Sequence, residues 1–138
     1  MAVPEHLWRF DTAAAVDSLA RRFCLPNDPR MQDWPWEVAD PKRLDEFLAA
    51  YDDGGISDDE RFTLMEIVIQ SFEDLGPAIA TDPRWGRTLE AIDRSIALHA
   101  HSVWYWSAVD SEAPEEQWLV TPFLRKILDR HRDRLERR

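Results

Sequence analysis

The residues best suited to chemistry are the carboxylates of residues 52–60, DDGGISDDE, which stand between two stretches of helical periodicity. Helix, acidic loop and helix is the outline of an EF-hand calcium site, in which a glycine occupies the sixth loop position and a glutamate the twelfth. With Gly54 sixth, Glu60 is twelfth, but the first and third ligand positions fall on Ala49 and Tyr51, which have no carboxylate. A tight helical hairpin explains the whole stretch, so the spacing predicts no metal at this loop.

A second candidate site lies among the histidines and aromatic residues near position 100. His99 and His101 are two residues apart, so on a helix their side chains point about 200° from each other and cannot share a metal ion from one face. His99 also continues an apolar helical seam, which favours a histidine in the core. Trp and Tyr are frequent binding anchors. We therefore keep a pocket near His99, Trp104 and Tyr105 as a candidate site of a small-molecule-binding protein or a hydrolase.

Other motifs for catalysis or cofactor binding are missing. The sequence contains no Glu-x-x-His, no His-Glu-x-x-His, no phosphate-binding glycine loop and no Gly-x-Ser-x-Gly. The single cysteine, Cys24, excludes an internal disulfide, and its place on an apolar helix face predicts a buried side chain. We expect no cofactor, and a protein that acts by binding and not by catalysis.

The net charge of −10 is unevenly distributed along the chain. Residues 33–82 contain 14 acidic and 3 basic side chains, whereas residues 125–138 contain 7 basic and 3 acidic ones. Because proteins contact phosphate groups through Lys and Arg, the acidic middle argues against a nucleic-acid partner. The acidic middle suits a basic protein partner.

Seven carboxylates concentrate on one predicted helical hairpin. They are Asp45, Asp52, Asp53, Asp58, Asp59, Glu66 and Glu73. The helix dipole favours Asp58 and Asp59 at a helix N-terminus, but it disfavours Asp52 and Asp53 at a helix C-terminus. This misplaced pair predicts a partner-binding surface. A rival interpretation is that the basic C-terminal helix folds back on this face and neutralises it.

These side chains are positioned by about five predicted helices, which makes the fold all-α. The central helix, residues 57–75, opens with the capping box Ser57-Asp-Asp-Glu60 and is apolar on most sides, so the other helices should surround it. The others are expected from a cap at Asp11 or Thr12 to about Cys24, over residues 41–53 and 83–108, and from the cap-plus-proline start Thr121-Pro122 onward. Residues 26–40 contain three prolines and are predicted to be an irregular connection. A single domain, residues 1–138, built as an orthogonal bundle or a short right-handed superhelix, satisfies this pattern.

Three stretches carry a resemblance to known proteins: ERFTLMEIVIQSFEDL, LHAHSVWYWSA and EQWLVTPFLRKIL. Over residues 40–130 the chain resembles small bacterial proteins of the domain-of-unknown-function type. The resemblance rests on a helical core with a Tyr-Trp pair, here Tyr105-Trp106, and on a late Thr-Pro-x-x-Arg helix start, here Thr121-Pro122 with Arg125. In size and acidity the chain also resembles immunity proteins that neutralise secreted toxins, which implies an acidic surface that meets a basic partner.

Location and function follow from the same features. No apolar run approaches the roughly 20 residues that span a bilayer, and the N-terminus MAVPEHLWRF lacks the basic start and apolar region of a signal peptide. We expect a cytoplasmic protein with no membrane partner. The predicted function is a non-catalytic, immunity-like protein-binding module, with the small-molecule binder or hydrolase as the alternative.

Overall fold

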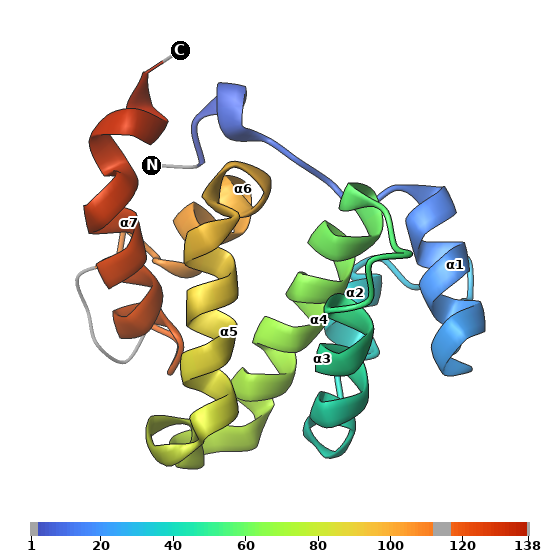
Figure 1. Ribbon diagram of the computed structural model, residues 1–138. Helices are drawn as coiled ribbons and strands as arrows, with labels where there is room; N and C mark the ends of the chain where they lie inside the picture. Colours follow the sequence, from blue (N-terminus) through green and yellow to red (C-terminus); the bar gives the residue numbers. More distant parts are fainter. Residues whose placement is uncertain (1–2, 112–116, 138) are drawn as a thin grey trace. The chain divides into compact units, whose positions relative to one another are not determined.

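The computed structural model describes residues 3–111 and 117–137, and every regular element in this part of the chain is helical. It contains seven α-helices, not the five expected, and three short 3-10 helices (Figure 1). The all-α prediction is confirmed. The predicted number is wrong because one loop contains a helix and one long helix is interrupted. None of the described helices is long and apolar enough to cross a membrane.

The chain groups into two compact units. We call Phe10–Leu75 the N-terminal unit, and the described parts of residues 1–9 and 76–138 the C-terminal unit. Each unit has its own packed helices, and we describe each by itself. The assignment of residues 1–138 to a single domain stays a prediction.

The N-terminal unit is organised around its longest helix. It contains α1 (Ala13–Phe23), α2 (Trp34–Glu37), α3 (Leu44–Tyr51) and α4 (Asp58–Leu75), with a 3-10 turn at Pro41–Arg43 before α3. α4 contacts each of the other three helices (Figure 1). Eight consecutive residues of α4, from Phe62 to Ile69, are buried. Because eight consecutive helical residues point in all directions, α4 is buried on most sides, as its sequence predicts.

The capping box at the start of α4 is confirmed. The backbone N–H of Glu60 donates to the Ser57 hydroxyl at 3.1 Å, and the N–H of Ser57 donates to the Glu60 carboxylate at 3.1 Å. The Ser18 hydroxyl of α1 donates to the other Glu60 oxygen at 2.8 Å. The hydrogen bond from the Ser57 backbone is the main reason that the pKa of Glu60 is lowered. Glu60 therefore joins the α3–α4 turn to α1.

The proline-rich connection contains one helical turn, which the sequence analysis missed. Trp34–Glu37 forms α2, with a proline in its first turn, where proline is well tolerated. The indole N–H of Trp34 donates to the Pro26 carbonyl at 2.7 Å, and that of Trp36 donates to Glu66 of α4 at 3.1 Å. These hydrogen bonds fix α2 to residues distant in the sequence. The prolines of this segment had predicted a loop instead.

The C-terminal unit packs three helices against one another. It contains α5 (Pro83–Arg94), α6 (Ile96–Trp106) and α7 (Thr121–Glu136), with 3-10 turns at Glu5–Leu7 and Gly76–Thr81. The helix predicted over residues 83–108 is interrupted at Ser95, whose backbone angles of −113° and 41° are not helical. Serine favours helix ends because its hydroxyl competes for backbone groups. The apolar seam nevertheless continues across the interruption, since Ile92 and Ile96 are both buried.

Cys24 is exposed, so the prediction of a buried thiol is wrong. Cys24 follows the last residue of α1 with φ of 54°, in the left-handed region. The next N–H, of Leu25, donates to the Ala20 carbonyl at 2.9 Å and closes the helix end. The left-handed backbone carries the side chain off the helical periodicity on which the prediction relied.

Candidate functional site

The acidic turn, residues 52–60, joins α3 to α4 and carries five carboxylates and no basic side chain. Asp52, Asp53, Asp58 and Asp59 are all exposed. Because the turn closes a tight hairpin, these carboxylates lie on one end of the N-terminal unit. The sequence prediction of a concentrated acidic surface therefore has a structural counterpart at this turn.

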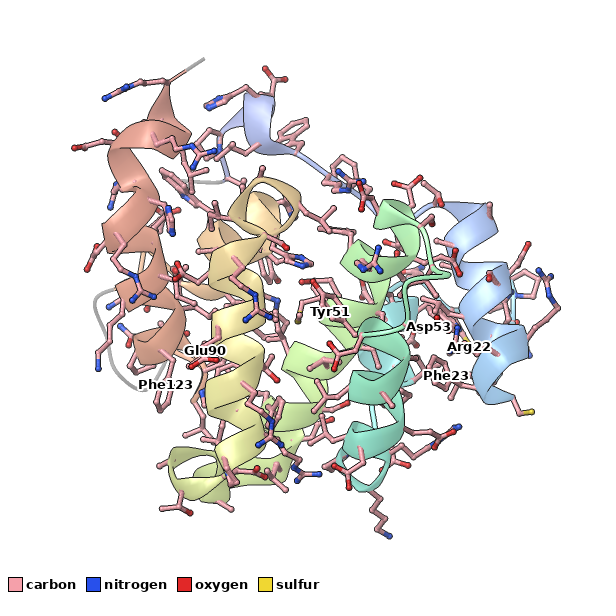
Figure 2. The ribbon with its side chains drawn as sticks, viewed as in Figure 1. Arg22, Phe23, Tyr51, Asp53, Glu90 and Phe123 are labelled. Atoms are coloured by element: carbon pink, nitrogen blue, oxygen red, sulfur yellow. The ribbon has the colours of Figure 1, made fainter. Side chains whose placement is uncertain are left out.

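Asp53 has a structural role in the turn. Its carboxylate accepts a hydrogen bond from the backbone N–H of Gly55 at 3.0 Å and forms an ion pair with Arg22 of α1 at 2.9 Å (Figure 2). These contacts lower the pKa of Asp53, the backbone hydrogen bond more than the ion pair. The position that the helix dipole disfavours is thus explained for Asp53 by local contacts.

Arg61 holds the acidic turn from within α4. Its guanidinium donates to the backbone carbonyls of Ile56 and Asp53, both at 3.0 Å, and lies 3.9 Å from the Asp58 carboxylate. Asp52 differs from these neighbours. It caps the C-terminus of α3, is exposed, and its carboxylate has no ion pair or hydrogen bond to another described residue.

The other three predicted acidic residues are spread along the hairpin. Glu66 is 7% exposed and accepts the indole hydrogen bond of Trp36, so it belongs to the interior. Asp45 is exposed in the first turn of α3, about 10 Å along the helix from Asp52. Glu73 is half-buried near the end of α4. The structure therefore brings Asp52, Asp53, Asp58 and Asp59 together in one turn. Asp45, Glu66 and Glu73 lie outside this turn.

His99 lies in the core of the described structure, as its place in the apolar seam predicts. It is 0% exposed. Burial lowers the pKa of His99 from 6.5 to about 4, and the positive charge of Arg9 contributes in the same direction. His99 is therefore a neutral imidazole at pH 7. Burial also lowers the pKa of the half-buried His101.

Trp104 and Tyr105 point to different surroundings in the C-terminal unit. Trp104 is buried, and the guanidinium of Arg132 lies over its ring, 5.1 Å from the centroid. Tyr105 is half-buried and stacks on Trp118, with ring centroids 5.4 Å apart.

The Thr-Pro-x-x-Arg stretch connects the start of α7 to the end of α6. Thr121 is the first residue of α7 and not its cap, because its hydroxyl donates to the Trp106 carbonyl at 2.8 Å. The guanidinium of Arg125 donates to the carbonyls of Ser107 at 2.6 Å, Ala108 at 2.7 Å and Ser111 at 2.9 Å. A cation at a helix C-terminus is favourable, and the bond to Ser107 satisfies the carbonyl of the residue that caps α6. The stretch thus has a structural function.

A cavity of about 380 Å³ lies beside this junction in the C-terminal unit. It is lined by Val109, Ser111, Arg125, Leu128, Asp129 and Arg132. Sequence reasoning missed it, although Arg125, Asp129 and Arg132 are spaced at helical intervals of four and three. That spacing is the signal from which this face could have been found.

In the described part of the chain, no three His, Cys, Asp or Glu residues form a group that could hold a metal ion.

No relative of this chain was found. Comparison of the chain with protein-family models, with curated proteins and with solved structures gives no match.

Proposed function

We propose that this protein is a non-catalytic binding module that recognises a basic protein partner through its acidic turn. The observation that carries the proposal is Asp52, an exposed carboxylate at the C-terminus of α3 with no counter-charge among the described residues. Negative charge at a helix C-terminus costs about 0.3–1 kcal/mol. The fold gains nothing from Asp52 that would offset this cost, whereas a basic partner would.

The neighbouring charges support the same proposal. Asp58 and Asp59 are exposed on the other side of the turn, so they add two carboxylates to those of Asp52 and Asp53 on a short, hydrogen-bonded loop. A pre-formed loop loses little conformational entropy on binding. Clustered charge of one sign also speeds association with a partner of opposite sign. An immunity-like protein that captures a basic toxin is one function of this type.

An NMR titration with an arginine-rich peptide tests the proposal. We expect the largest amide shifts in residues 52–60, and we expect binding to weaken as salt is raised. Asp52→Lys combined with Asp58→Lys should abolish these shifts. Asp133→Lys, an equally exposed site on α7, is the control for charge and should leave them unchanged. Shifts spread evenly over acidic residues of both units would show only general electrostatic attraction and would refute a specific site.

The rival interpretation, in which basic residues of α7 neutralise the acidic surface, makes a different prediction. Lys126→Glu with Arg134→Glu would then destabilise the fold, and more so at low salt, where screening is weak. Our proposal expects almost no change in stability, because both side chains are exposed. Thermal melting at two salt concentrations separates the two interpretations.

The alternative, a small-molecule binder or hydrolase with a pocket near His99, Trp104 and Tyr105, stays a prediction. The cavity of about 380 Å³ beside the α6–α7 junction is lined by other residues. A cytoplasmic location and the arrangement of the helices as an orthogonal bundle or short superhelix both stay predictions.

A further inference from the structure

The cavity beside the α6–α7 junction presents three charged side chains from one face of α7. Arg125, Asp129 and Arg132 follow one another at intervals of four and three residues, so they project within about 60° of each other around the helix. Val109 and Leu128 supply apolar lining. A cavity of about 380 Å³ is within the range of small-molecule sites, roughly 300–1,000 Å³.

Both guanidinium groups of the cavity are held in place by other contacts. Arg125 uses Nε and one terminal nitrogen on the three carbonyls that follow α6. Arg132 donates through Nε to Glu136 at 2.8 Å and lies over the Trp104 ring. The remaining terminal nitrogens, one on Arg125 and two on Arg132, donate no hydrogen bond to another described residue. Fixed cations with spare donors are pre-organised to bind an anionic group.

Asp129 lies between the two arginines and pairs with neither. Carboxylate and guanidinium groups at these helical spacings commonly form ion pairs. Here no ion pair or hydrogen bond joins the Asp129 carboxylate to another described residue, and the contacts of the two guanidinium groups are made to the carbonyls after α6 and to Glu136. Asp129 is exposed, so its negative charge faces water and the cavity. The cavity thus offers an acceptor for a cation and donors for an anion.

We propose that this cavity binds a small zwitterion of the free α-amino acid class. The two terminal nitrogens of Arg132 bind the ligand carboxylate as a fork, assisted by the spare nitrogen of Arg125. The Asp129 carboxylate binds the ligand ammonium. Val109 and Leu128 contact the apolar part of the ligand. A ligand with only one of the two charges leaves either Asp129 or the arginines unpaired, which is unfavourable. The cavity and the acidic turn share no residue, so this proposal neither requires nor tests the proposed binding of a basic partner.

Matched probe ligands test the proposal by NMR titration of the whole protein. The probes are a mixture of the common free amino acids, then leucine with isocaproate and isoamylamine, which lack its ammonium and its carboxylate respectively. We expect the amino-acid mixture to shift the amides of residues 109, 111 and 125–132. We expect isocaproate and isoamylamine to bind at least tenfold more weakly than leucine, or than whichever amino acid of the mixture binds most tightly.

Two pairs of variants identify the residues responsible. Asp129→Asn and Arg132→Gln should each weaken amino-acid binding at least tenfold. Asp133→Asn and Arg134→Gln make the same changes at exposed positions of α7 that do not line the cavity, and they should leave binding unchanged. All four positions are on the surface of α7 or partly exposed, so circular dichroism should show an intact fold. The absence of any shift with the mixture, binding of isocaproate as tight as that of the amino acid, or equal losses in the control variants would each overturn the proposal.

Discussion

Replacing Arg125 with methionine removes the guanidinium that joins the end of α6 to α7, while it keeps a side chain of similar length. Three carbonyls lose a charged donor, those of Ser107, Ala108 and Ser111. Ser107 is 0% exposed, so water cannot replace its lost partner, whereas Ala108 and Ser111 are half-buried and can be hydrated.

The expected loss of stability follows from these exposures. A buried carbonyl left without a partner costs about 1–3 kcal/mol. Loss of the cation at the C-terminus of α6 adds about 0.3–1 kcal/mol. We therefore expect Arg125→Met to lower the free energy of unfolding by about 1–4 kcal/mol, compared with the roughly 5–15 kcal/mol of a typical domain.

Urea unfolding followed by circular dichroism measures this loss. Lys126→Met is the matched control, because Lys126 is the exposed neighbour on α7 and should change stability by no more than about 0.5 kcal/mol. Arg125→Lys keeps the charge, but a single ammonium group cannot donate to all three carbonyls as the guanidinium does. Its loss of unfolding free energy should therefore lie between those of the other two variants. If Arg125→Met and Lys126→Met unfold at the same urea concentration, the carbonyls at the end of α6 do not depend on Arg125 and the reasoning is wrong.

Four other predictions concern the core, pH, the end of α1 and calcium. In urea unfolding, Ile69→Ala should lower the free energy of unfolding by about 2–5 kcal/mol, because the Ile69 side chain is fully buried. Ser57→Ala should lower it by about 0.5–2 kcal/mol through loss of the cap alone. Equal losses would contradict the central position of α4. The folded-state pKa of His99 is about 4 and the ordinary value is 6.5, so between these pH values the unfolded chain binds more protons than the folded one. The free energy of unfolding should therefore fall by roughly 3 kcal/mol as the pH drops from 6.5 to 4. His99→Gln should flatten this part of a profile of stability against pH. Cys24→Gly should raise the thermal midpoint slightly, a gain of roughly 0.5–1 kcal/mol from relief of the left-handed backbone, whereas Cys24→Val should lower it. Calcium at sub-millimolar concentration should leave the melting temperature unchanged, and a rise of several degrees would overturn the ligand-position argument for the acidic turn.

The candidate sites were predictable only in part. The acidic turn could be found from sequence because its carboxylates are close together along the chain. The separate roles within it could not, because Asp53 is explained by Arg22, which lies 31 residues earlier on another helix. Glu66 was grouped with surface carboxylates, yet Trp36 donates to it from a segment predicted to be irregular. The cavity beside α7 was missed because its lining depends on how α6 ends.

The sequence by itself determined where three of the described helices begin, α1, α4 and α5. Ser57 with Glu60, Asp82 and Thr12 each bond a backbone N–H within three residues of their own position. Such hydrogen bonds join neighbours in the chain, so the local residue pattern specifies them whatever the rest of the molecule does.

Only the tertiary structure decided where helices are interrupted, which side chains are buried and where a cavity forms. Ser95 interrupts a seam of apolar residues that continues unbroken in the sequence, and the left-handed Cys24 turns outward from an apolar face. Arg125 and Asp129 lie one turn apart on the same helix. Arg125 donates to backbone carbonyls that follow α6, whereas the Asp129 side chain lines a cavity. The physical reason is that burial and pairing depend on groups brought together from distant parts of the chain, and a local pattern contains no information on which groups those are.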